Sequence, residues 1–113
     1  MNKQQVKNYA AVKSFDVLRD LGKVKGRTEF SKFYCGRNSD YFSMILRSGR
    51  RMSIGALTRL IKRLEFEIGN EKNDQVRIKL NECFSSLQAE VMIRLNQQAS
   101  LNSAERTDAS RAI

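Results

Sequence analysis

The side chains that could perform covalent or acid–base chemistry are few in this chain. Cys35 and Cys83 each lie in a segment of periodic apolar residues, and neither belongs to a Cys-x-x-Cys pair. The sequence contains no histidine, which removes most zinc sites, a histidine-activated nucleophile and the usual general base. We therefore predict two buried thiols without a disulfide, and neither a metal nor a cofactor.

Two close pairs of acids are the remaining candidates for catalysis. Asp16 and Asp20 form one pair, and Glu65 and Glu67 form the other. Both pairs lie in segments with helical periodicity, where charged residues commonly form the solvated face of a helix. The sequence therefore predicts a binding protein and not an enzyme.

The net charge of the whole chain at pH 7 is +9. The positive charge is concentrated in the first half of the chain. Residues 1–36 hold eight Lys and Arg against three Asp and Glu, and residues 37–64 hold seven against one. Residues 65–98 reverse the balance, with four against six. A basic block of this kind indicates a polyanionic partner, and the acidic second half requires a different role.

The elements that position these charges are all predicted to be helices. Apolar residues recur three or four positions apart between glycines that can end a helix. We expect Thr28, then Asn38 or Ser39, and then Ser53 to cap helices. The predicted helices cover residues 3–21, 28–35, 38–48, 53–68 and 71–98. The fold class is therefore all-α, with four to five helices, no strands and a flexible tail over 99–113.

The spacing of apolar residues between 28 and 65 resembles the helix-turn-helix of the lambda-repressor and Cro superfamily. Phe30 and Phe33 match its first helix and Gly36 its turn. Tyr41-Phe42-Ser43 matches the family's Tyr-Leu-Ser in the recognition helix, and Ile45 and Gly49 follow at the matching positions. Met52-Ser53-Ile54 replaces a frequent Pro-Ser-Leu, and Leu57, Leu60 and Leu64 continue the next helix.

One position departs from the family pattern. The family usually has a small residue four positions before the turn glycine, where this chain has Lys32. Ser31 matches the small residue only if Cys35 takes the turn position, which requires one inserted residue. The sequence leaves both alignments open.

The resemblance implies that the helix near 38–48 enters the major groove of duplex DNA, where base edges carry a full donor and acceptor code. Asp40 has two possible roles, as an acceptor from cytosine or as a helix cap. The base-reading candidates are Asn38, Ser39, Asp40, Ser43, Met44 and Arg47. The phosphate-binding candidates are Lys25, Arg27, Lys32, Arg37, Arg50 and Arg51.

The helix predicted over 71–98 has one apolar stripe at near-heptad spacing. The stripe consists of Val76, Leu80, Cys83, Phe84, Leu87, Val91 and Leu95. Because two recognition helices one DNA turn apart give more specificity than one, we favour a homodimer that pairs through this stripe. The alternative is that the helix folds back onto the core of its own chain.

These observations predict a DNA-binding domain over 1–70, a dimerisation helix over 71–98 and a tail over 99–113. The predicted protein is a dimeric transcription regulator of prokaryotic, phage or plasmid type, with a repressor favoured. The alternatives are an adaptor whose basic face docks an acidic protein, and a small RNA-binding regulator. No segment is apolar for the roughly 18 residues that a membrane span requires, and no signal peptide is evident, so we expect a cytoplasmic protein without membrane contact.

Overall fold

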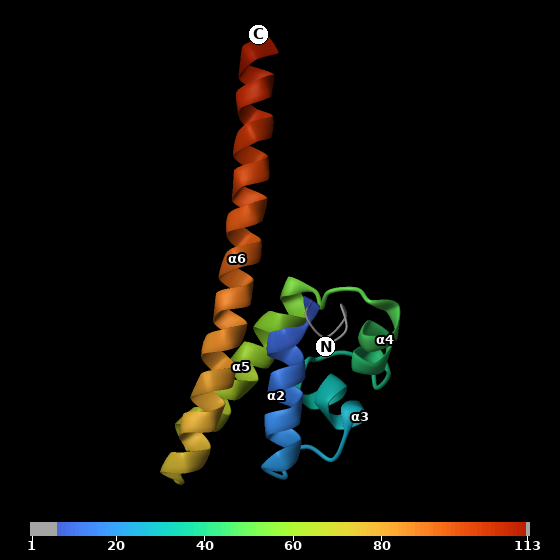
Figure 1. Cartoon of the computed structure of the whole chain (residues 1–113), viewed down its shortest axis with the longest axis vertical. Helices are drawn as coiled ribbons and strands as arrows, with labels where there is room; N and C mark the ends of the chain where they lie inside the picture. Colours follow the sequence, from blue (N-terminus) through green and yellow to red (C-terminus); the bar gives the residue numbers. More distant parts are fainter. Residues whose placement is uncertain (1–6, 113) are drawn as a thin grey trace.

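In a computed structural model, the chain folds into helices joined by short links (Figure 1). The structure describes the backbone of residues 7–112 and the side chains of residues 7–99. The helices are α2 (Tyr9–Asp20), α3 (Arg27–Glu29), η1 (Phe30–Tyr34), α4 (Tyr41–Ser48), α5 (Ile54–Asn70) and α6 (Asp74–Ala112). No strand occurs within residues 7–112, which confirms the all-α prediction at the level of fold class. None of these helices combines the length and the apolar character that crossing a membrane requires.

The ends of the helices follow local chemistry in most places. Gly22, which follows the C-cap Leu21 of α2, and Gly49, the C-cap of α4, have φ of 74° and 70°, in the left-handed region that glycine enters without a steric penalty. Ser53 caps α5 by accepting a hydrogen bond from the N–H of Ala56 at 3.1 Å. The prediction for Thr28 was wrong, because α3 begins one residue earlier, at Arg27, without a side-chain cap.

An aromatic cluster joins α2, η1 and α4. The ring of Phe42 lies 4.7 Å from that of Phe30 and 5.2 Å from that of Phe15, centroid to centroid. Both contacts have the inclined geometry that aromatic pairs prefer. Phe30 and Phe42 are completely buried, so this cluster fixes the rotation of α4 about its own axis.

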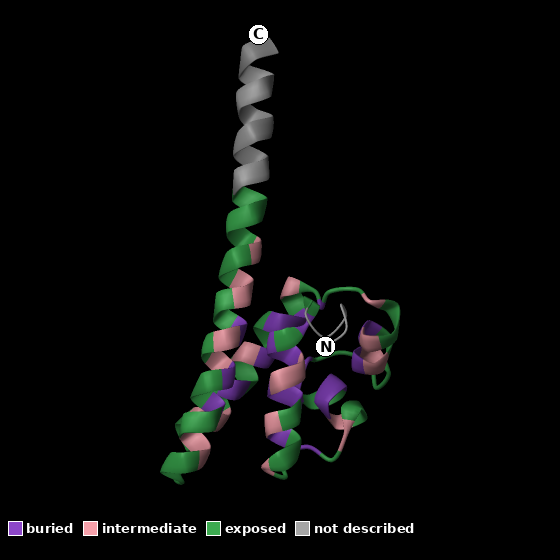
Figure 2. Cartoon of the chain, in the orientation of Figure 1, coloured by how far each residue is buried: buried purple, intermediate pink, exposed green. Residues whose placement is uncertain are grey.

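Helix α6 packs along α5 and α2 of the same chain. Leu80, Cys83 and Leu87 are completely buried in the common core, and Val76, Phe84 and Val91 pack against it. Figure 2 shows the buried residues of α6 on the side facing the body of the protein. The predicted dimerisation stripe is therefore wrong for Leu80, Cys83 and Leu87, because their side chains are already covered within one chain, whereas Val76, Phe84 and Val91 are only partly buried. Leu95, the seventh, is 45% exposed.

The last part of α6 projects beyond the other helices (Figure 1). The helix continues to Ala112, whereas the sequence predicted a flexible tail from residue 99. Neither glycine nor proline occurs after Gly69, so no residue type that readily ends a helix interrupts this segment. The helix was predicted to end at residue 98 because the apolar face is lost there. Loss of an apolar face does not by itself end a helix.

Candidate nucleic-acid interface

The segment before α4 contains one turn of π-helix. The N–H of Cys35 donates to the carbonyl oxygen of Phe30, five residues earlier, at 3.0 Å. A π turn accommodates one more residue than an α turn, and such turns often mark functional sites. Ser31 and Cys35 are consequently buried, whereas Lys32 is exposed. At the contact with the next helix, the structure therefore has the small Ser31 on the inner side and Lys32 in solvent.

Ser31 connects η1 to α4 through its hydroxyl group. Its Oγ accepts a hydrogen bond from the N–H of Phe42 at 3.0 Å and donates to the carbonyl oxygen of Arg27 at 2.8 Å. The residue is completely buried. The first N–H groups of a helix have no hydrogen-bond acceptor within the helix. Ser31, from the preceding element, provides the acceptor for the N–H of Phe42. The short side chain also allows the two elements to approach closely.

Substituting Ser31 with alanine should therefore destabilise the protein. The N–H of Phe42 would remain buried without a partner, which costs about 1–3 kcal/mol. We expect the free energy of unfolding, measured by urea denaturation, to fall by that amount. Ser48→Ala is the matched control, because Ser48 is exposed and its loss should change stability by no more than about 0.5 kcal/mol. Equal losses in the two variants would contradict the linking role of Ser31.

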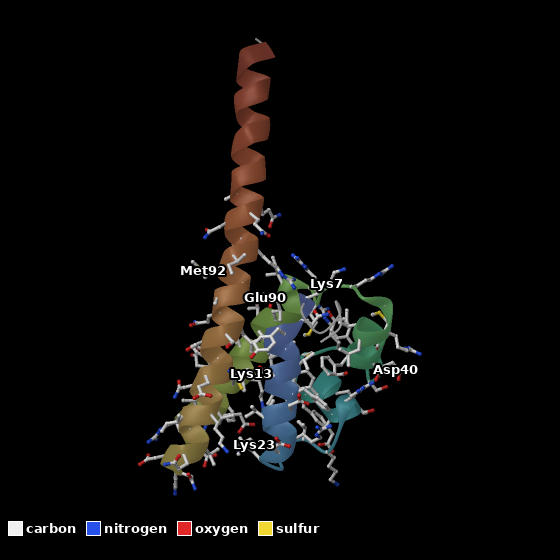
Figure 3. The ribbon with its side chains drawn as sticks, viewed as in Figure 1. Lys7, Lys13, Lys23, Asp40, Glu90 and Met92 are labelled. Carbon is white, nitrogen blue, oxygen red and sulfur yellow. The ribbon has the colours of Figure 1, made fainter. Side chains whose placement is uncertain are left out.

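The six predicted base-reading residues form a surface at the start and along one side of α4. We call Asn38, Ser39, Asp40, Ser43, Met44 and Arg47 the α4 surface. Five of them are exposed and Ser43 is intermediate. Figure 3 places Asp40 on the side of the protein away from α6 and the labelled Met92. The α4 surface is thus open to a large partner approaching from that side.

Hydrogen bonding at the start of α4 involves Asn38 more than Asp40. The side-chain oxygen of Asn38 accepts from the N–H of Asp40 at 3.2 Å, and its carbonyl oxygen accepts from the N–H of Tyr41 at 3.1 Å. Asp40 occupies the N-cap position, but its side chain makes no cap hydrogen bond. Its carboxylate therefore does not serve as the predicted cap, and Asn38 performs the local turn-forming role.

Arg37 is held in place at one end of the α4 surface. Its guanidinium lies 5.8 Å from the ring centroid of Tyr41 and donates to Oγ of Ser53 at 3.1 Å. The hydroxyl of Tyr41 in turn accepts from the N–H of Ser53 at 3.2 Å. These contacts join the link before α4 to the start of α5. The Arg37 side chain is consequently oriented before any partner binds.

Arg50 and Arg51 lie at the other end, in the link between α4 and α5, and both are exposed. Asn8 fixes the backbone of this link. Its amide nitrogen donates to the carbonyl oxygen of Arg50 at 3.0 Å, and its amide oxygen accepts from the N–H of Met52 at 3.0 Å. Asn8 is almost completely buried. No sequence pattern indicates this role, because the partners lie more than 40 residues away.

The other predicted phosphate-binding residues lie on different elements. Lys25 is in the link before α3, and Arg27 is its first residue. The ammonium group of Lys32 lies 5.8 Å from the ring centroid of the exposed Phe33 on η1. All three are exposed, but only Arg37, Arg50 and Arg51 lie in the links that directly flank α4.

Sequence reasoning missed Arg59, whose side chain covers the turn at Gly36. A Cβ added at Gly36 would lie 2.7 Å from Nε of Arg59, and φ at Gly36 is +65°. Both observations explain a glycine at this position. The available signal was the four-residue spacing of Gly55, Arg59 and Arg63, which places them on one face of α5.

The two thiols are unsuited to chemistry, as predicted. Cys35 and Cys83 are both free and completely buried. Burial raises the pKa of Cys35 to about 12, and burial likewise raises the pKa of Cys83. Both are therefore protonated at neutral pH, and a protonated thiol is a poor nucleophile and metal ligand. Within residues 7–99, no three Cys, Asp or Glu side chains gather in a way that could hold a metal ion.

The fold and the surface together define a small protein, helical over the residues described, with an amphipathic helix α4 whose outer face lies between Arg37 and the Arg50–Arg51 pair. The chain belongs to DUF6626, a family of unknown function, whose model matches residues 13–107. No curated protein and no solved structure matches the chain.

Proposed function

We propose that this protein is a sequence-specific duplex-DNA-binding transcription regulator, a repressor, with α4 as its recognition helix. The observation that supports this most is the exposed α4 surface, flanked by Arg37 before the helix and by Arg50 and Arg51 after it. An α-helix fits the major groove, and cations at its two ends can neutralise the phosphates on either side.

The side chains of the α4 surface suit base recognition. Ser39 and Ser43 can donate or accept hydrogen bonds at base edges, and Arg47 can form a bidentate contact with guanine. Met44, which is 36% exposed, can contact the methyl group of thymine. The buried Phe42 and Ile45 on the opposite side of α4 hold this arrangement against the core, so the recognition helix is oriented in advance.

A homodimer remains part of the proposal, with an interface formed by exposed apolar residues of α6. Met92 and Ile93 are each 57% exposed and Leu95 is 45% exposed, in the segment of α6 that follows Val91. Pairing of two chains through this segment would bury these side chains without disturbing the core. Light scattering after size-exclusion chromatography would measure the mass in solution.

The test is selection of bound sequences from a pool of random duplex DNA. We expect a defined sequence motif, with an inverted repeat if the protein is a dimer. Ser43→Ala should change the preference at one or two base pairs, by about 1–3 kcal/mol of discrimination for each lost contact. The control Lys79→Ala alters an exposed cation on α6 and should leave the motif unchanged. Failure to enrich any motif would contradict the proposal.

A further inference from the structure

A second surface lies between η1 and α5, and the proposed function does not use it. It is a groove of about 310 Å³, which we call the η1–α5 groove. The lining residues are Phe33, Tyr34, Arg59, Lys62, Arg63 and Phe66. Three of them are aromatic and three are cationic, and none is acidic.

Two phenylalanines of the groove are unusually accessible. Phe33 is 59% exposed and Phe66 is 60% exposed. An exposed phenylalanine does not contribute its full apolar area to the core, and adjacent exposed apolar side chains commonly mark interaction sites. Aromatic and arginine side chains are also the residues most enriched at the centres of protein interfaces. The composition of the groove therefore indicates a partner with an apolar segment to insert.

The charge of the groove indicates which residues flank the apolar segment in the partner. The carboxylate of Glu67 contacts two of the lining residues: it accepts from the hydroxyl of Tyr34 at 2.7 Å and pairs with Nε of Arg63 at 3.3 Å. Nζ of Lys23 lies 3.7 Å from its other oxygen. Arg59 and Lys62 are exposed, and Lys32 lies beside Phe33. The rim is thus positively charged and complements an acidic partner.

The position of Arg63 favours a peptide over a single-stranded nucleic acid. Its guanidinium lies 5.2 Å from the ring centroid of Tyr34 and 5.6 Å from that of Phe66. Proteins that bind single strands stack successive bases on aromatic faces. Here the guanidinium already lies against both rings, and a stacked base would have to displace it. An aliphatic or aromatic side chain can instead enter between Phe33 and Phe66 while Arg63 stays in place.

From these observations we propose that the η1–α5 groove binds a short acidic peptide segment of another protein, anchored by an apolar side chain between Phe33 and Phe66. The two anchoring residues, Phe33 on η1 and Phe66 on α5, are not part of the α4 surface, although Arg59 of the groove also covers the turn at Gly36 before α4. Binding of a peptide therefore does not require the proposed DNA-binding function to hold.

The experiment is selection of a phage-displayed library of random 12-residue peptides on the full chain. Enriched peptides are synthesised with a fluorophore, and their affinity is measured by fluorescence anisotropy. We expect peptides that combine several Asp or Glu with one or two large apolar residues. Their affinity should fall about tenfold or more for Phe33→Ala and for Phe66→Ala. The control Ile78→Ala removes an apolar side chain of similar exposure (53%) on α6 and should have no effect.

Each other outcome would overturn the proposal. No enrichment, enriched peptides without acidic residues, or peptides bound equally by Phe66→Ala would each exclude an acidic-peptide site in the groove. A labelled dT12 strand is measured in parallel, and its binding, if lost in Phe66→Ala, would assign the groove to single-stranded nucleic acid. Duplex DNA binding should be unchanged in Phe66→Ala, so failure of this proposal and failure of the proposed DNA-binding function are separate results.

Discussion

Replacing both Arg50 and Arg51 with alanine should weaken binding to duplex DNA of any sequence by about a hundredfold for each protein chain bound, at about 50 mM salt. Each phosphate contact releases condensed counterions and adds roughly 0.9 to the slope of log affinity against log salt concentration. The slope should therefore fall by about 1.8 for each protein chain bound. Filter binding or anisotropy over a series of salt concentrations would measure both quantities.

The fold should tolerate this double substitution. Both side chains are exposed, and the backbone of the link is held by Asn8 and not by the arginines themselves. The matched control is Lys72→Ala with Lys79→Ala, which removes the same charge from exposed positions near and on α6. If the control lost as much affinity as the arginine variant, binding would depend on net charge alone and α4 would have no special role.

The sequence was most informative where a local pattern determines local structure. Leu57, Leu60 and Leu64 recur at helical spacing, and each is buried on α5. Ser53 and Gly49 mark helix ends through hydrogen bonding and backbone preferences that involve only their neighbours. Such features depend on residues a few positions apart, so one sequence is enough to predict them.

The π turn before α4 illustrates a feature that spacing alone left undecided. The sequence allowed either Lys32 or Ser31 at the close contact with the next helix. The choice depends on the buried cluster of Phe15, Phe30 and Phe42, which forms between segments far apart in the chain. The π turn brings Phe30 and Ser31 to the inner side together, and no local propensity predicts it.

The sequence was enough to name the residues of the candidate site, but not the residues whose contacts hold them in place. The residues of the α4 surface were named from a resemblance, and the structure leaves them accessible, but their binding of DNA stays a prediction. The contacts that orient the site come from Asn8 and Ser53, which reach across the fold. Polar residues that bind distant backbone groups have no periodicity, so a sequence pattern does not distinguish them from surface residues.

The apolar stripe of α6 likewise indicates that one face of the helix is buried, but it does not indicate which surface buries it. Leu87→Ala tests the answer that the structure gives. The side chain is completely buried where α6 packs on α5 and α2. Truncating such a leucine leaves a cavity, and the free energy of unfolding should fall by about 2–5 kcal/mol. Urea denaturation would measure this loss.

Protein concentration distinguishes the two possible sources of that loss. Because the cavity lies within one chain, the difference between Leu87→Ala and the wild type should be the same at concentrations that differ about tenfold. If the stripe instead joined two chains, the loss would depend on concentration by mass action, and the variant would dissociate before it unfolded. Ile78→Ala is the control on the same helix, since a side chain that is 53% exposed leaves no closed cavity. Its substitution should cost clearly less than that of Leu87, and a larger cost would place the covered face of α6 at Ile78.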